Sequence, residues 1–201
     1  METEMESEKQ RPEIDTREQL LLAGIEYIEK NGIEKLSMRQ LASSIGLSCA
    51  APYKHYKNKN EFIVAIIRYI KDEWNSITKK IALTHENKDA STREILTEIS
   101  IEYIRFLVEH PSFRAIILMN DENLSPEQAK EKNELSERSR SFIMKYCSEV
   151  GMSEEDRIRK TFIVRSIIYG AALMMDSGEI GKTDADYEMV KECIRREFDI
   201  K

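Results

Sequence analysis

The chain has 201 residues, of which 41% are hydrophobic and 34% charged, and its formal net charge at pH 7 is −6. This composition fits one or two helix-rich domains with a sizeable core. The acidic total excludes a protein that coats nucleic acid over its whole surface. No apolar run approaches the ~18 residues that a membrane span needs.

The charge is distributed unevenly along the chain. Residues 1–9 carry −3, residues 10–60 carry +2 and residues 61–201 carry −5. Residues 1–14 are acidic and lack an apolar core, so we expect a disordered arm here and no secretory signal. The three cysteines have neither metal-binding nor redox spacing, which fits a reducing compartment. We therefore expect a cytoplasmic protein.

The first predicted helix begins at the sequence Thr16-Arg17-Glu18-Gln19, which has the form of a capping box. Apolar residues recur behind it at helical spacing as far as about Lys30, and Asn31-Gly32 ends the helix. We interpret this helix as the support for the segment that follows.

The segment from Ser37 to Asn60 contains no acidic residue. Its first half predicts a short helix with Ser37 as the cap, an apolar stripe of Leu41 and Ile45, and Gly46 just past the end, where a left-handed backbone is needed. This pattern favours a tight turn after the helix, from which Leu47 points inward.

A second short helix should follow the turn. Proline is tolerated only in the first turn of a helix, so Pro52 requires this helix to begin close to Ser48, which can cap it. Tyr56 should turn to the core. Two short helices around a glycine-containing turn are typical of a helix-turn-helix, whose second helix enters the DNA major groove.

The run from Thr16 to about Tyr69 resembles the DNA-binding domain of the tetracycline-repressor-like (TetR) family of transcriptional regulators. The residues that carry the resemblance are Arg17, Leu20 to Gly24, Ile28, Gly32, Leu36 to Arg39, Leu41-Ala42, Ile45 to Ser48, Tyr53 to Tyr56 and Asn58 to Glu61. Pro52 and Tyr56 depart from the family pattern, where an aliphatic residue and phenylalanine are usual.

The resemblance implies an all-α protein. Residues 15–60 would form a three-helix DNA-binding domain, extending to about residue 75 with the start of a long connecting helix. Residues 61–201 would form a helical regulatory and dimerisation domain. The residues expected to bind DNA are Ser37, Arg39, Ser48, Ala50, Ala51, Tyr53, Lys54, His55, Lys57 and Lys59. Arg39, Ala50, Ala51 and Lys54 would face bases, and the expected phosphate contacts come from Ser37, Tyr53, His55, Lys57 and Lys59.

The connecting helix should begin at Asn58, where Asn58-x-x-Glu61 again has capping-box form, and run to about Thr84. Further helices are expected from Ser91 or Thr92 to about Glu109, over residues 113–120, and from Ser125 to about Val150. Polar loops should cover residues 85–91 and 121–124. Ser153-x-x-Asp156 begins a helix that is apolar nearly all round, and Asp184 or Asp186 caps a last helix.

In the family, the last two long helices pair with those of a second copy, so the resemblance implies a homodimer. The residues expected at this interface are Phe162, Ser166, Gly170, Leu173, Val190 and Ile194. The family also binds small molecules among the helices of the second domain. The hypothesised pocket walls are Tyr103, Phe106, Met119, Phe142, Tyr146, Met174 and Met175, although such stripes are more often core.

Taken together, the residues and the resemblance predict a repressor that binds a pseudo-palindromic operator in double-stranded DNA and is released by a small-molecule effector. An enzyme is the main rival class, but no catalytic or nucleotide-binding motif occurs, so we expect no catalysis, no cofactor and no metal site. A helical protein–protein adaptor is the other alternative. The acid-free basic segment argues against it, and a gel shift would separate the two.

Overall fold

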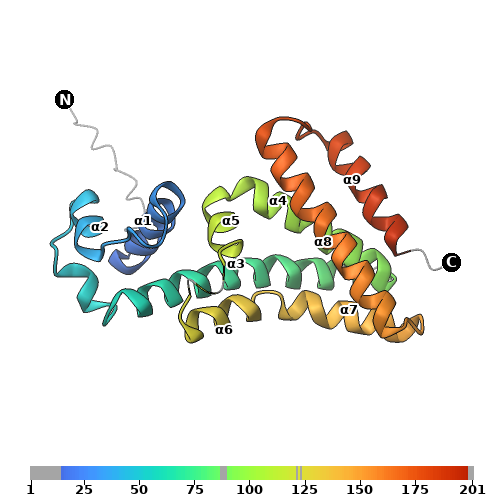
Figure 1. Ribbon diagram of the computed structural model, residues 1–201, viewed down its shortest axis with the longest axis horizontal. Helices are drawn as coiled ribbons and strands as arrows, with labels where there is room; N and C mark the ends of the chain where they lie inside the picture. The colour runs from blue at the N-terminus through green and yellow to red at the C-terminus, as the bar shows by residue number, and fades with distance from the viewer. Residues whose placement is uncertain (1–14, 87–89, 121, 123, 199–201) are drawn as a thin grey trace, which may run out of the picture. The chain divides into compact units, whose positions relative to one another are not determined.

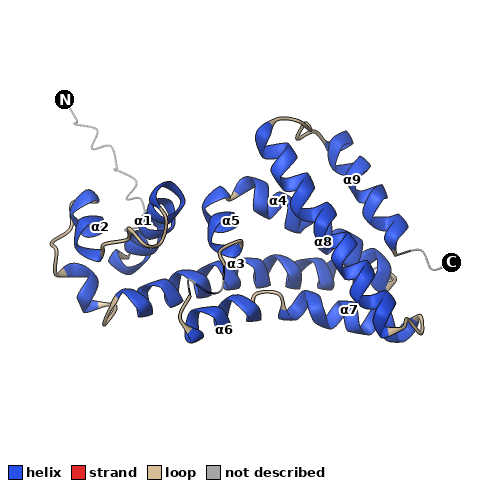
Figure 2. Cartoon of the chain, in the orientation of Figure 1, coloured by secondary structure: helices blue, strands red, loops and turns tan. Residues whose placement is uncertain are grey.

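The computed structural model describes residues 15–86, 90–120, 122 and 124–198. Regular structure in these residues is entirely helical (Figures 1 and 2). The predicted all-α fold is therefore confirmed. The chain divides between Phe62 and Ile63 into two units. The arm expected over residues 1–14 lies outside the described residues.

The first unit is built from α1 (Thr16–Asn31), α2 (Met38–Ser44), the short 3₁₀ helix η1 (Ala51–Lys54) and the start of α3. Asp15, not Thr16, caps α1, because its side chain accepts a hydrogen bond from the Arg17 amide. Ser37 caps α2 as predicted and accepts from the Gln40 amide. The unit's core consists of Leu20, Leu21, Ile25, Ile28, Ile33, Leu36, Met38, Leu41, Ala42, Ala51, Tyr56 and Phe62.

The turn after α2 has the predicted left-handed glycine, with φ of +76° at Gly46. It is closed by a 2.8 Å hydrogen bond from the Leu47 amide to the Ala42 carbonyl. Ile45, however, is the C-cap of α2 and is 36% exposed, so it does not extend the apolar stripe.

The second short helix differs from the prediction. It begins at Ala51, three residues after Ser48, and is a single 3₁₀ turn without a side-chain cap. Ser48 contributes its backbone carbonyl, which accepts from the Ala51 amide at 2.9 Å. Pro52 in the first turn leaves room for only a few residues before Tyr56 must enter the core, and so short a helix closes i→i+3 bonds.

The long helix α3 (Lys59–Glu86) has 28 residues, which corresponds to about 42 Å at 1.5 Å per residue. Its start is fixed by Asn58, whose side-chain oxygen accepts from the Glu61 amide at 2.9 Å. The Glu61 carboxylate accepts in turn from the Lys57 amide. The predicted cap is therefore present, with its reciprocal bond displaced by one residue.

The second unit is organised around α4 (Thr92–Glu109), which packs against α5 (Pro111–Ile117), α7 (Glu137–Glu149), α8 (Glu154–Ser177) and α9 (Asp184–Glu197). Ser91 closes a full capping box on α4 with Glu94. Trp74 brings α3 into this core, with its ring 4.7 Å from that of Tyr103 and 5.4 Å from that of Phe106.

Two expectations about the later helices are wrong. The single helix expected from Ser125 to Val150 is two helices, α6 (Pro126–Glu134) and α7, separated at Leu135 and Ser136. The side chain of Leu135 is buried at this break, which satisfies its apolar character without a continuous helix. Thr183, not an aspartate, caps α9, and Asp186 completes its capping box.

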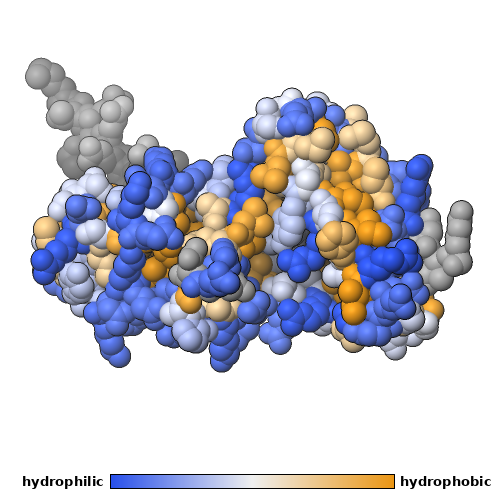
Figure 3. Space-filling view, in the orientation of Figure 1, coloured by the Kyte–Doolittle hydropathy of each residue, from blue (hydrophilic) through white to orange (hydrophobic). Residues whose placement is uncertain are grey.

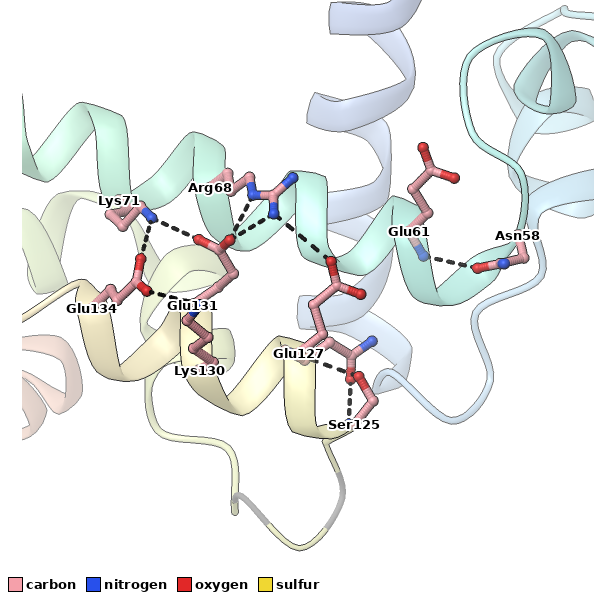
Figure 4. A network of polar contacts seen from close by, with 10 residues as sticks. Asn58, Glu61, Arg68, Lys71, Ser125, Glu127, Lys130, Glu131 and Glu134 are labelled. Carbon is pink, nitrogen blue, oxygen red and sulfur yellow. Dashed lines mark hydrogen bonds and ion pairs between the residues drawn. The ribbon is translucent and has the colours of Figure 1, made fainter.

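An ion-pair network joins α6 to α3 (Figure 4). The Glu131 carboxylate accepts hydrogen bonds from Arg68 at 2.7 Å and from Lys71 at 2.6 Å. Lys71 also reaches Glu134, and Arg68 reaches Glu127. The network holds the polar helix α6 against the half of α3 that belongs to the second unit.

None of the helices in the described ranges is both long and apolar enough to cross a membrane. Their apolar residues instead form the cores of the two units.

Candidate functional sites: a basic surface and a cavity

The residues predicted to contact DNA lie mostly on the surface of the first unit. Seven of the ten are exposed, and Ser37 and Lys59 are half-buried. Ala51 is the exception, because it is buried in the core of the unit and cannot face a base. The exposed seven are Arg39, Ser48, Ala50, Tyr53, Lys54, His55 and Lys57.

Tyr56 fixes the direction in which its neighbours project. Its ring is 2% exposed and packs edge-on against Phe62 at 4.9 Å, and its hydroxyl donates to the Arg17 carbonyl at 3.4 Å. Burial raises the pKa of this phenol above its ordinary value. Because Tyr56 is anchored inward, the preceding residues Tyr53 and Lys54 are left on the outer side of the turn.

Lys59 has a structural contact that the sequence did not reveal. Its ammonium group donates to the Glu34 carbonyl at 3.1 Å and so ties the start of α3 to the link between α1 and α2. Tyr27 supports the same link through its hydroxyl, which donates to the Lys35 carbonyl. The short helices are thus held by side chains on both flanking helices.

The second unit contains a cavity of about 220 Å³ between α3, α4, α7 and α8. Only Tyr103 and Tyr146 of the seven predicted wall residues line it. Phe106 and Met175 are buried in the core, Met119 and Phe142 are half-buried away from the cavity, and Met174 is exposed. These five do not line this cavity, because helical spacing does not show which neighbouring helices leave a gap.

The cavity is lined mostly by apolar side chains, and its polar lining groups are neutral or positively charged. Trp74, Leu96, Ile99, Leu135, Ile143, Cys147, Met152, Val164, Ile168 and Phe198 form most of the wall. Tyr169, Ser100, Ser136, Ser139 and Thr161 contribute hydroxyl groups, and Arg140, Arg157, Lys160 and Arg165 carry positive charge. Among the described residues, no aspartate or glutamate lines it.

The predicted dimer residues fall into two groups. Phe162 is 71% exposed and Leu173 is 52% exposed, with Ser166 also on the surface and Gly170 half-buried. Val190 and Ile194 are buried within the chain, where α9 packs on α4 and α8. These two residues are corrected from interface to core. Figure 3 shows hydrophobic surface gathered over α8 and α9.

The first unit has the arrangement of a helix-turn-helix DNA-binding unit, and the whole chain has the two-part helical fold of TetR-type regulators. Residues 20–66 match the family model of bacterial regulatory proteins, tetR family. Residues 20–66 thus match the DNA-binding domain of the TetR family, and the comparison of folds below extends the likeness to the helical arrangement of the rest of the chain.

Solved structures show the same fold over most of the chain. A TetR transcriptional regulator from Legionella pneumophila has a TM-score of 0.70 at 16% identity, covering 92% of this chain and 98% of that one. The regulator FadR from Bacillus subtilis, in complex with stearoyl-CoA, has a TM-score of 0.64 at 16% identity, covering 88% and 96%.

A curated relative matches only part of the chain. The nucleoid occlusion factor SlmA from Salmonella typhi is 32% identical over 88 residues, which are 43% of this chain and 43% of that protein. The match thus spans less than half of the relative's length.

Proposed function

We propose that the chain is a homodimeric repressor that binds a pseudo-palindromic operator and leaves it when a small molecule occupies the cavity. The observation that carries the proposal is the exposed basic surface of the first unit. It is acid-free from Ser37 to Asn60 in a chain whose net charge is −6. A local positive surface on an acidic protein favours one docking face for DNA.

We divide the exposed side chains of this basic surface into those that contact base edges and those that contact phosphates. Lys54 lies at the end of η1 and Arg39 at the start of α2, so we assign them to base edges. Tyr53, His55 and Lys57 follow the backbone around the turn and are assigned to phosphates, which position a protein without reading sequence. One 3₁₀ turn reads few base pairs, so two copies on a two-fold site are expected.

The exposed apolar residues of α8 support the homodimer. Ile158, Phe162 and Leu173 are each more than half exposed, and apolar residues on this scale mark interaction surfaces when they lie together. A second copy of α8 would cover them through the same surface on each partner, as two-fold symmetry requires.

The cavity supports the response to a small molecule. Trp74 of α3 lines it, and α3 begins at Lys59 beside the basic surface. A ligand that contacts α3 can favour one state of the protein over another, and such coupling typically changes affinity 5- to 150-fold. The stearoyl-CoA complex of FadR is a precedent for a ligand on this fold.

The experiment that tests the proposal is selection of bound sequences from a random pool of duplex DNA, followed by binding titrations at several salt concentrations. Three to four neutralised phosphates per subunit predict a slope of log K against log salt of about −5 to −7 for a dimer. Enrichment of an inverted repeat is expected. A flat salt dependence would contradict the assigned surface.

Two matched lysine variants separate the roles within this surface. Lys54→Ala should weaken binding and relax the preference at one base position, whereas Lys57→Ala should weaken all sequences alike and make the salt slope shallower by about one unit per subunit. Both lysines are exposed, so neither change should disturb folding. Identical effects on preference would overturn the division into base and phosphate contacts.

The relationship to SlmA favours a second candidate, a nucleoid-associated role for the same DNA-binding surface. Selection of bound DNA separates the two. A repressor of particular genes has few strong sites, placed near promoters, whereas a nucleoid factor has many sites spread over the chromosome.

A further inference from the structure

We propose that the cavity binds a compact monocarboxylate, with an apolar body of about eight carbon atoms and its carboxylate held by Arg165 of α8. The inference rests on the proposed function, because it names the chemical class of the effector. It goes beyond that function in assigning the charge of the ligand, its size and the residue that recognises it.

The charge of the cavity lining indicates the charge of the ligand. Its lining contains four basic residues, whereas the chain as a whole has more acidic than basic residues. Two of the four have negative or backbone partners. Arg157 is paired with Glu154, and Lys160 donates to the Glu197 carbonyl.

The other two are held only by neutral groups among the described contacts. Arg140 donates to the Ser136 hydroxyl at 3.4 Å, and Arg165 donates to the Tyr169 hydroxyl at 3.2 Å. A guanidinium has five N–H donors, so each keeps donors for an anion. Both charges are therefore available to compensate a ligand, and a carboxylate matches their planar geometry.

Arg165 is chosen over Arg140 because it belongs to a polar cluster that reaches the cavity wall. Its guanidinium lies 5.6 Å from the centroid of the Tyr169 ring, which stands at 62° to the ring of Tyr103 with 6.5 Å between centroids. Burial first, and then the neighbouring Tyr169, raise the pKa of Tyr103. The Tyr103 hydroxyl is hydrogen-bonded to Tyr169, which in turn accepts from Arg165, so the three side chains form one polar cluster at the cavity wall.

The polar groups of the lining around Tyr146 and Phe198 already have partners. The Tyr146 hydroxyl donates to the Phe198 carbonyl, and the two rings pack edge-on at 5.5 Å. Ser100 already donates to the Leu96 carbonyl. Arg157, whose charge acts on Cys147, is bonded to Glu154, and Lys160 donates to the Glu197 carbonyl next to Phe198. Cys147 lies in the same lining, and burial raises the pKa of its thiol. Because these polar groups already have partners, we assign the apolar body of the ligand to this part of the lining.

The volume sets the size of that body. A cavity of 150 Å³ is known to hold benzene, which corresponds to roughly 25 Å³ for each carbon. On this scale the 220 Å³ of the present cavity accommodates on the order of nine carbon atoms. On this scale an eight-carbon acid fills the cavity with its head at Arg165, whereas a sixteen-carbon chain would extend beyond it.

The experiment is calorimetric titration of the full chain with octanoate, with octanamide as the uncharged match and with hexadecanoate below its micelle concentration. Octanoate should bind roughly ten- to a hundredfold more tightly than octanamide, because a hydrogen bond to a charged group exceeds a neutral one. Hexadecanoate should bind more weakly than octanoate despite its larger apolar area.

Matched arginine variants locate the head group. Arg165→Gln should remove the preference for octanoate over octanamide and leave octanamide binding unchanged. Arg159→Gln changes an exposed arginine of the same helix that pairs with Asp156 and should retain the preference. A loss at Arg140→Gln with none at Arg165→Gln would overturn the assignment to Arg165. The ligand class is overturned by equal binding of octanoate and octanamide, by absence of binding, or by tighter binding of hexadecanoate.

The DNA assay keeps this result separate from the proposed function. If the protein binds the selected DNA but does not bind octanoate, the proposed ligand class is wrong and the proposed DNA-binding function is unaffected. If the protein binds octanoate but selects no DNA sequence, the proposed DNA-binding function is wrong and the ligand class is supported. Release of selected DNA by octanoate, lost in Arg165→Gln, supports both.

Discussion

Replacement of Glu131 by glutamine tests the network between α3 and α6. Glu131 is 7% exposed, and its carboxylate accepts from both Arg68 and Lys71 at 2.7 Å or less. Glutamine has nearly the same shape but no charge. The variant therefore measures what the charge contributes, separately from packing.

The expected loss lies between two limits. Breaking a fully buried ion pair costs about 3–5 kcal/mol, and an exposed pair contributes about 0–1 kcal/mol. The Lys71 side chain is 18% exposed and that of Arg68 is 52% exposed. After the change, Lys71 retains Glu134 at 3.0 Å. We therefore expect a loss of about 2 kcal/mol in the free energy of unfolding.

The loss should depend on pH in a defined direction. Burial opposes ionisation of Glu131, but the hydrogen bonds from Arg68 and Lys71 outweigh it and hold the pKa of the carboxyl below its ordinary value. Its contribution is then complete above the unfolded pKa of about 4.3 and is lost as the pH falls through the folded pKa. The difference between wild type and variant should shrink on acidification.

Urea unfolding followed by circular dichroism, from neutral pH down to about pH 3, below the unfolded pKa, supplies the measurement. Glu188→Gln is the control, because Glu188 is exposed on α9, and it should change stability by less than about 0.5 kcal/mol. A Glu131→Gln loss as small as the control, or one that does not vary with pH, would refute the reasoning.

Two further predictions concern backbone and association. Gly46→Ala should lower the free energy of unfolding, measured with urea, by about 1 kcal/mol. The cause is the left-handed backbone alone, because nothing lies within 4 Å of the added carbon. An unchanged urea midpoint would contradict this prediction. Phe162→Glu should raise the dimer dissociation constant at least a hundredfold in sedimentation equilibrium, since each protomer loses about 1.5–3 kcal/mol of apolar burial. Leu83→Glu, exposed on α3, should leave association unchanged; equal effects would place the interface elsewhere.

Local signals in the sequence predicted the helix ends well. Ser37, Ser91, Ser125 and Ser153 each cap the helix that follows them, because a cap depends on residues only two or three positions away. Gly46 is left-handed for the same local reason. Errors arose where tertiary packing decides. No proline or glycine marks the break between α6 and α7, at which Leu135 is buried.

The candidate sites follow the same division. The basic surface lies within one continuous segment, so its exposed residues could be predicted with the exception of Ala51. The cavity is formed by helices far apart in the chain, and the sequence identified only Tyr103 and Tyr146 of its wall. The contributions of Arg165 and Tyr169 depend on how α8 lies against α4, which no local spacing specifies.

The position of Trp74 has a practical consequence. The chain contains one tryptophan, and it is 1% exposed, lines the cavity and contacts Tyr103. Intrinsic emission excited at the indole band therefore originates at a single point beside the cavity. Without any label, its wavelength and quenching report on that point as molecules enter or leave.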